Sequence, residues 1–272
     1  MFVSALCPAR ILGVETATSA TPQMIYRPDL FLCLIALLGG SPAMAAQNPW
    51  PGPAEPLRIA LPAVAPPSTM IEARAYTQDG IADALAYDLG KALNRKPAAV
   101  EPDDPTAHLT LGRATDGQGT ATGYRSGLTV AMRSDTDILA WDDLAGRKVC
   151  FTSTNEEAAK LVATYHATPL PQRAPALSLM KLRTGECDAA LHESELLTAL
   201  FQQQEWQKFS ASLPVQAEAD LRLSVADPGF TTILRPALDP LTTPAAWDIR
   251  KNRWARNVAF EVWLEQDAPD CH

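Results

Sequence analysis

The sequence predicts an α/β protein built as two lobes, and three observations lead to this fold class. Residues 57–61 form a short apolar run, and after a loop they are followed by a helical pattern at 81–93, an order typical of an α/β unit. Residues 148–201 repeat the order strand, helix, strand, which predicts a second small lobe with a parallel sheet. The chain has 272 residues, of which 47% are apolar, enough to form packed cores.

The N-terminal segment has the pattern of a cleavable export signal. Its apolar run, residues 30–38, follows Arg27 and is too short to span a bilayer, which needs roughly 20 residues. The run ends in residues 39–42 (GGSP), and residues 43–45 (AMA) fit the small-x-small cleavage rule, so we expect cleavage after Ala45 and a signal segment of residues 1–45. Because such signals start close to their apolar core, we expect Met24 to be the initiator and the residues before it to be dispensable.

The net charge limits the partners of the chain. The formal charge at pH 7 is -8. Binding to nucleic acid or to an anionic membrane surface requires a basic patch, because phosphate groups must be neutralised. We therefore expect neither partner.

The first lobe is predicted to begin with the buried strand at 57–61, which a proline closes. In the helix at 81–93 the apolar positions recur at helical spacing. Residues 108–111 are predicted to form another strand. It runs into the glycine-rich stretch 112–123, in which we expect little regular structure.

The second lobe is predicted from alternating strand and helix patterns. Residues 152–157 contain hydroxyl, amide and acidic side chains that suit a helix N-cap and first turn. Residues 247–264 are predicted to form the last helix, with Trp254, Val258 and Trp263 packed inward. The other predicted elements are a strand at 128–132, a turn at 141–146, strands at 148–151 and 188–191, and helices around 177–182 and 196–201.

Three cysteines remain after the predicted cleavage site. Cys150 and Cys187 lie close to two segments predicted to be neighbouring strands, so they form the favoured disulfide pair, and Cys271 is expected to be free. No pair of cysteines has the C-x-x-C spacing of a redox or zinc site. We expect no metal and no cofactor.

Several segments of the chain together resemble one protein family. The stretches 142–149 (DDLAGRKV), 152–154 (TST) and 185–193 (GECDAALHE) resemble the second lobe of the type II periplasmic solute-binding proteins, in particular the family 3-like substrate-binding proteins of amino-acid ABC transporters. Residues 57–61, 88–93 and 124–127 resemble the family's opening strand, first helix and crossover. The matches follow the family's order at nearly its spacing.

The resemblance implies two Rossmann-like lobes joined by two crossovers, with a cleft between them. Residues 46–126 and 225–272 would form lobe 1, and residues 127–224 would form lobe 2. A small polar or amino-acid-like solute would be captured in the cleft by hinge closure. The resemblance further implies a periplasmic monomer without enzymatic activity, which serves an inner-membrane ABC permease or another periplasmic protein.

The resemblance carries binding roles to three residues, and four others could replace an arginine and an aromatic residue that the family has and this sequence lacks at the expected positions. Glu193 falls where the family pairs an acid with an α-ammonium group, with a solvated acid at a helix start as the alternative. Ser153 and Thr154 fall where hydroxyls and a helix N-terminus hold a carboxylate, and helix capping is the alternative for both. The remaining four are Arg113 and Arg125, either of which can hold a carboxylate bidentately, and Tyr76 and Tyr124 as stacking rings, with a surface arginine and core packing as the respective alternatives.

Two other functions stay open at this point. The chain could be an accessory or scaffold protein that keeps the lobes but has lost the ligand site. It could also resemble periplasmic cyclohexadienyl dehydratases, which use a carboxylate in the cleft as a general acid. His192 and Glu193 are the only close imidazole and acid in the expected cleft, but as neighbours on a strand they would face opposite sides.

Overall fold

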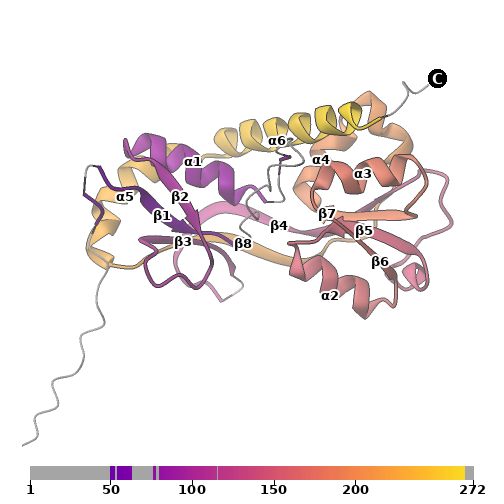
Figure 1. Ribbon diagram of the computed structural model, residues 1–272, viewed down its shortest axis with the longest axis horizontal. Coiled ribbons are helices and arrows are strands. Elements are labelled where there is room, and N and C mark those ends of the chain that lie inside the picture. Colours follow the sequence, from indigo (N-terminus) through magenta and orange to yellow (C-terminus); the bar gives the residue numbers. More distant parts are fainter. Residues whose placement is uncertain (1–49, 53, 63–75, 78–79, 115, 267–272) are drawn as a thin grey trace, which may run out of the picture. The chain divides into compact units, whose positions relative to one another are not determined.

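The strands of the computed structural model form one mixed sheet of eight strands in the order β2-β1-β3-β8-β4-β7-β5-β6 (Figure 1). The structure describes residues 50–52, 54–62, 76–77, 80–114 and 116–266. The predicted signal segment and Cys271 lie outside these residues. The strands are β1 (Leu57–Ala60), β2 (Pro97–Val100), β3 (Leu109–Ala114), β4 (Thr120–Met132), β5 (Lys148–Thr152), β6 (Thr168–Gln172), β7 (Ala189–Glu193) and β8 (Gln216–Val225).

The sheet repeats one topology on either side of a central pair of strands. β1 pairs in parallel with β2 and β3, and β5 pairs in parallel with β6 and β7, so each trio has its first strand in the middle. The long strands β4 and β8 pair antiparallel with each other, and they join the sheet to β7 and β3 respectively. The predicted α/β fold with two crossover segments is confirmed.

Gly127 lies where the backbones of the two central strands approach each other closely. The register between β4 and β8 shifts between Ser126 and Leu128. A Cβ atom on Gly127 would overlap the carbonyl oxygen of Gln216 on β8. Glycine is therefore required here, because only a residue without a side chain allows the two backbones to approach this closely.

Three strands, β2, β6 and β8, were not predicted from the sequence, and β3 and β4 were predicted too short. β2 begins at Pro97, and β6 contains Pro169 and Pro171. Both are edge strands, where a proline that lacks an N–H group is tolerated. The expectation of little regular structure at 112–123 was wrong, because β3 extends to Ala114 and β4 already begins at Thr120.

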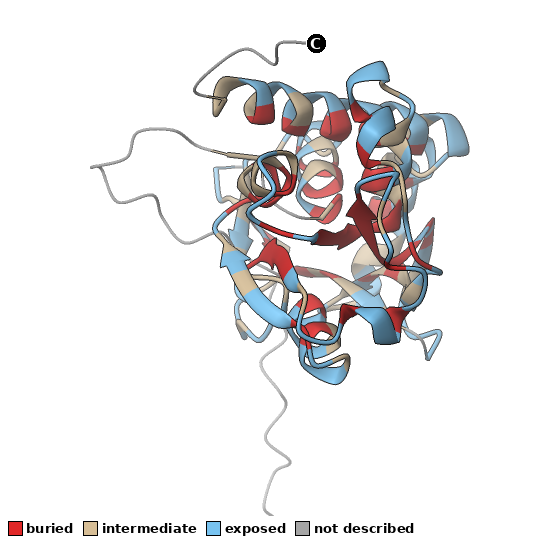
Figure 2. Ribbon diagram, turned by 90° about the vertical axis from the view of Figure 1, so that its right-hand side faces the viewer, coloured by how far each residue is buried: buried red, intermediate tan, exposed pale blue. Residues whose placement is uncertain are grey.

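The helices cover both faces of the sheet. α2 packs on one face of β5, and α3 and α4 pack on the other face of the same half (Figure 1). Buried residues line the sheet and the inward sides of these helices (Figure 2). The α-helices are α1 (Ala82–Ala92), α2 (Glu156–Thr164), α3 (Pro175–Arg183), α4 (Ser194–Phe201), α5 (Thr231–Leu238) and α6 (Pro244–Leu264), and the 3-10 helices are η1 (Trp141–Leu144), η2 (Gln204–Phe209), η3 (Pro228–Phe230) and η4 (Asp239–Leu241).

The long helix α6 contacts both halves of the fold. Arg250, which is 3% exposed, pairs with Asp88 of α1 through Nε and Oδ2 at 2.8 Å. The next residue, Lys251, pairs with Glu195 of α4 at 3.0 Å. Trp254 and Val258 are buried as predicted, whereas the prediction for Trp263 was wrong, since this ring is 62% exposed and stacks on Phe260. No helix within the described ranges is long and apolar enough to cross a membrane.

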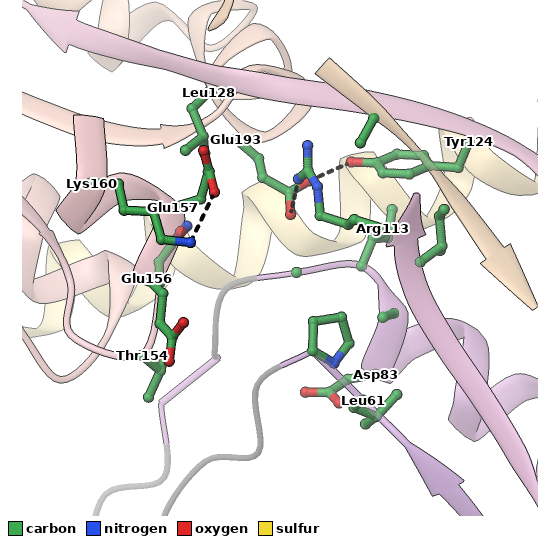
Figure 3. A pocket seen from close by; sticks show the side chains of 17 residues that line it. Leu61, Asp83, Arg113, Tyr124, Leu128, Thr154, Glu156, Glu157, Lys160 and Glu193 are labelled. Atoms are coloured by element: carbon green, nitrogen blue, oxygen red, sulfur yellow. Dashed lines mark hydrogen bonds and ion pairs between the residues drawn. The ribbon is translucent and has the colours of Figure 1, made fainter. Parts of the chain in front are cut away.

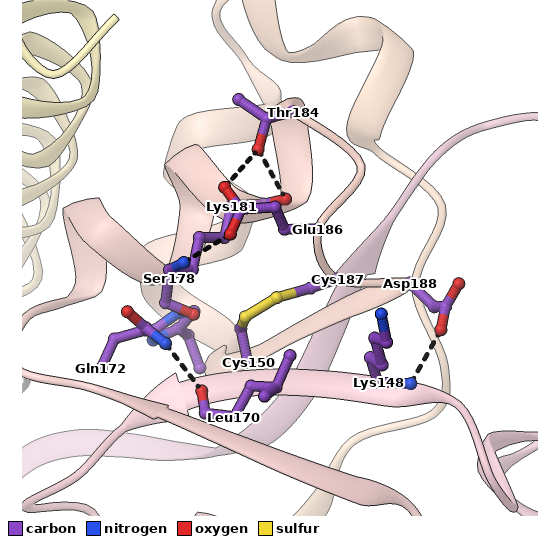
Figure 4. The surroundings of a disulfide bond; sticks show 11 residues. Lys148, Cys150, Leu170, Gln172, Ser178, Lys181, Thr184, Glu186, Cys187 and Asp188 are labelled. Atoms are coloured by element: carbon purple, nitrogen blue, oxygen red, sulfur yellow. Dashed lines mark hydrogen bonds and ion pairs between the residues drawn. A yellow bond between two sulfur atoms is a disulfide. The ribbon is translucent and has the colours of Figure 1, made fainter.

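A disulfide joins Cys150 of β5 to Cys187, which lies just before β7 (Figure 4). The Cα atoms are 5.9 Å apart, within the range of protein disulfides. Both residues are buried, and β5 and β7 are paired neighbours in the sheet. The bond therefore links β5 to the segment just before its parallel neighbour β7 and encloses α2, β6 and α3 in its loop.

Candidate functional site

A cavity of about 240 Å³ lies where the carboxyl ends of β1, β5 and β7 meet the first turns of α1 and α2 (Figure 3). Ligands of α/β proteins commonly bind at the carboxyl ends of parallel strands. The wall draws on both halves of the sheet. It consists of Leu61, Pro62, Gly80, Ile81, Ala82, Asp83, Arg113, Tyr124, Leu128, Thr154, Asn155, Glu156, Glu157, Lys160, Glu193, Ala219 and Leu221.

Glu193, the last residue of β7, is the most buried acid of this wall. It is 7% exposed. The hydroxyl of Tyr124 donates a hydrogen bond of 2.8 Å to its Oε2 atom, and Nη1 of Arg113 lies 3.5 Å from Oε1 (Figure 3). A buried carboxylate needs such charged or hydrogen-bonding partners, because desolvation otherwise disfavours its charge. The site thus presents a fixed negative group at its inner wall.

Tyr124 is positioned on β4 to act as a donor to this acid. Burial, and next the negative charge of Glu193, raise the pKa of Tyr124 well above its usual value. The hydroxyl therefore stays protonated at neutral pH. Its ring packs against Trp247 of α6, with centroids 5.0 Å apart.

Arg113 of β3 is held by both central strands. Its Nη2 atom donates to the carbonyl oxygen of Ser126 on β4 and, at 3.3 Å, to that of Ala217 on β8. These bonds fix the plane of the guanidinium and leave Nη1 facing Glu193. The arginine therefore joins one half of the sheet to an acid on the other.

The first turn of α2 forms the opposite wall. Asn155 is the N-cap, and its side chain accepts a hydrogen bond of 3.0 Å from the N–H of Ala158. Thr154 lines the cavity just before this cap. Lys160 lies 3.6 Å from the carboxylate of Glu157, one turn earlier on the same helix. Since Asn155 caps the helix, the capping alternative for Ser153 and Thr154 does not describe their side chains.

Asp83 was not foreseen as a site residue. It is the second residue of α1 and lines the cavity. The residue as a whole is exposed. Desolvation of its carboxyl group nevertheless raises its pKa from 3.8 to about 6. The available signal was its place at the start of the helix that follows the first strand, because that helix begins beside the carboxyl end of β1.

Three of the seven expected site residues lie outside this cavity. Arg125 is next to Tyr124 on β4, and neighbouring strand residues face opposite sides, so it pairs instead with Glu218 at 3.2 Å and with Asp220 at 3.4 Å. Ser153 is exposed, and its N–H donates to the carbonyl oxygen of Gln172.

Tyr76 is the third of these residues. Its hydroxyl donates a hydrogen bond to Glu265 at the end of α6, and the guanidinium of Arg173 lies 4.9 Å from the centre of its ring. Burial, followed by the hydrogen bond to Glu265, raises its pKa. The ring therefore packs at α6, and the cavity keeps four of the seven expected residues: Arg113, Tyr124, Thr154 and Glu193.

His192 faces away from the cavity. Its Nε2 atom lies 2.9 Å from the hydroxyl oxygen of Ser178 on α3, on the other side of β7 from Glu193. The alternation of side chains along a strand thus separates the imidazole from the acid, as expected. Within the described ranges, no group of three or more His, Cys, Asp or Glu side chains is arranged to hold a metal ion.

Comparisons with known proteins place the fold. No protein-family model matches the sequence, and no curated protein matches it significantly. The GluR0 ligand-binding core from Nostoc punctiforme, solved with L-glutamate, superposes with a TM-score of 0.51 at 18% identity, over 73% of this chain and 99% of that chain. A second GluR0 ligand-binding core with L-glutamate gives 0.51 at 13% identity, over 75% and 100%. A mutant of ArgBP from T. maritima gives 0.50 at 16% identity, over 73% and 94%. The chain therefore has the fold of the type II periplasmic binding proteins.

Proposed function

We propose that this protein is a solute-binding protein that captures a small polar or amino-acid-like ligand in the cavity between the two halves of its sheet. The observation that carries the proposal is the buried carboxylate of Glu193, held by Tyr124 and Arg113 at the inner wall of that cavity. A fixed, mostly desolvated acid of this kind suits a ligand ammonium group. A small ligand site typically combines an apolar wall with a few such oriented polar groups.

The two walls come from different parts of the chain. Arg113 and Asp83 belong to the half around β1, and Glu193 and Thr154 belong to the half around β5. A ligand between them would contact both halves at once, so its binding energy would favour the closed arrangement. Closure would also exclude water and strengthen each charged hydrogen bond.

Structures with a similar fold support a small polar ligand. Two of them were solved with L-glutamate in a ligand-binding core. An amino acid or a compound of similar size is accordingly the first ligand class to test. We further propose residues 46–126 with 225–272 as lobe 1 and residues 127–224 as lobe 2.

The cellular setting is part of the same proposal. We propose export through the signal segment 1–45 to the periplasm, where the protein would act as a monomer and present its ligand to an inner-membrane ABC permease. The accessory-protein and dehydratase functions are the alternatives that the following experiment separates from it.

The experiment starts with residues 46–272 purified from a periplasm. The protein is unfolded, and any released small molecule is identified by mass spectrometry. The refolded protein is then screened by thermal unfolding against the proteinogenic amino acids, their amines and prephenate. A ligand at 100 times its Kd should add about 2.7 kcal/mol to the free energy of unfolding.

Matched variants then separate the site from the surface. Glu193→Gln should abolish the ligand-dependent stabilisation, whereas Glu218→Gln, which alters an exposed acid paired with Arg125, should keep it. The absence of any ligand, together with a protein recovered by pull-down, would replace the proposal with the accessory function. Prephenate turnover that disappears in Glu193→Gln would replace it with the dehydratase function.

A further inference from the structure

The charges that line the cavity do not balance. Among the residues that the structure describes, four acids line it, namely Asp83, Glu156, Glu157 and Glu193, against two bases, Arg113 and Lys160. If all six are ionised, the wall carries an excess of two negative charges. A bound ligand has to be compatible with that excess.

Both bases are already engaged by acids of the same wall. Arg113 faces Glu193 at 3.5 Å and is held by two backbone carbonyl groups. Lys160 lies 3.6 Å from Glu157. The charges of both bases are therefore already offset by acids of the protein, Glu193 and Glu157.

The other two acids have no such partner. Among the residues that the structure describes, neither Asp83 nor Glu156 makes a side-chain hydrogen bond or an ion pair. Asp83 comes from the first turn of α1 and Glu156 from the first turn of α2, on opposite walls of the cavity (Figure 3). Both are exposed at its rim, where an approaching ligand would meet them first. Partial desolvation raises the pKa of Asp83 to about 6.

Apolar side chains line the cavity together with these acids. Leu61, Ile81, Leu128 and Leu221 line the same cavity as Glu193. An alkyl chain could contact them while its ends meet acids of the wall. The same wall therefore combines exposed acids, apolar side chains and the buried acid Glu193.

We propose that the ligand is a small organic dication, an alkyl chain with an ammonium group at each end, and that Asp83 and Glu156 select for the outer of its two charges. This inference rests on the proposed function, because it assigns a ligand class to the same cavity. One ammonium group would bind Glu193, and the other would lie between the two unpaired acids when the walls close. Aliphatic diamines carry this pair of ammonium groups alone, and L-lysine carries the same pair together with a carboxylate.

Four probes that differ in one group test the proposal by isothermal titration of the wild-type mature protein. L-Lysine carries both ammonium groups, L-norleucine lacks the outer one, 1,5-diaminopentane lacks the carboxylate, and L-glutamate has an acid instead. We expect L-lysine or 1,5-diaminopentane, or both, to bind at least about tenfold more tightly than L-norleucine and L-glutamate, since a charged hydrogen bond contributes about that factor. Comparison of 1,5-diaminopentane with L-lysine shows whether the cavity prefers the pair of ammonium groups without or with a carboxylate.

Charge-removing variants test whether Asp83 and Glu156 select for the outer ammonium group. Asp83→Asn and Glu156→Gln should each weaken binding of the preferred dication about threefold to tenfold and leave binding of L-norleucine unchanged. Asp103→Asn and Glu101→Gln, which remove the same charges from exposed positions outside the cavity, should change neither.

Two results would overturn the inference, and they have different consequences. If L-norleucine or L-glutamate binds as tightly as both dications, the cavity binds solutes but does not select for charge, and the proposed function survives. If none of the four probes nor any compound of the wider panel binds, the proposed function fails along with the inference.

Discussion

Removal of the disulfide between Cys150 and Cys187 should destabilise the protein strongly. The bond closes a loop over a sequence separation of 37 residues. In the chain-entropy relation, a loop of this length removes about 13 cal/mol/K from the unfolded chain, or about 3.8 kcal/mol at 25 °C. For a domain of this size each kcal/mol corresponds to about 2–4 °C in Tm, so the loss amounts to about 8–15 °C.

The assay is equilibrium unfolding of residues 46–272 in urea, followed by tryptophan fluorescence. The double variant Cys150→Ala and Cys187→Ala is compared with its parent, both carrying Cys271→Ala so that no other thiol of this segment can form a mixed disulfide. The parent treated with a reductant should approach the double variant, while the double variant itself should not respond to the reductant. A loss below about 1 kcal/mol would refute the reasoning that loop closure governs the contribution of this bond.

The structure predicts the direction of the stability change for three further substitutions. Arg250→Met should cost about 2–3 kcal/mol in urea unfolding, because it leaves the carboxylate of Asp88 without its 2.8 Å partner, although Arg253 at 3.7 Å compensates in part. Tyr124→Phe should cost about 1–2 kcal/mol in the same assay, because it removes a buried hydrogen-bond donor to a carboxylate. Asp83 has a folded-state pKa of about 6, above its unfolded value of 3.8, so the folded state binds its proton more tightly and stability falls as the pH rises through this window. Relative to the parent, Asp83→Asn should therefore gain Tm above pH 6 compared with its value at pH 4, as measured by thermal unfolding across pH.

Matched controls accompany these variants. Arg253→Met removes the more exposed and more distant partner of Asp88 and should cost less than Arg250→Met. Tyr87→Phe alters a tyrosine that is 58% exposed and should be neutral. An Arg250→Met protein as stable as its parent would contradict the bridging role of α6. A Tm difference for Asp83→Asn that stays constant from pH 4 to pH 8 would show that the carboxyl group does not titrate in this window.

Much of the secondary structure follows from local patterns. The strand at 57–61 and the helix at 81–93 were predicted almost to their ends, because a short apolar run and a helical repeat of apolar residues are read directly from the chain. The edge strand β6 was missed because Pro169 and Pro171 break the local strand signal. A proline is tolerated there because the strand has a neighbour on only one side. Which strands lie at the edge is decided when the sheet assembles.

The candidate site divides in the same way. The sequence by itself predicted a strand at 188–191 and, for His192 and Glu193 as strand neighbours, opposite faces, since alternation is a local property of an extended backbone. The structure extends this strand to Glu193. Only the tertiary structure decided which arginine faces that acid. Arg113 meets Glu193 across 80 positions of sequence, while Arg125 is turned outward by the pleat of β4. Asp83 and Glu156 likewise became parts of one cavity only when two distant helices were brought to the same edge of the sheet, because the packing of non-local elements, and not any spacing along the chain, sets those distances.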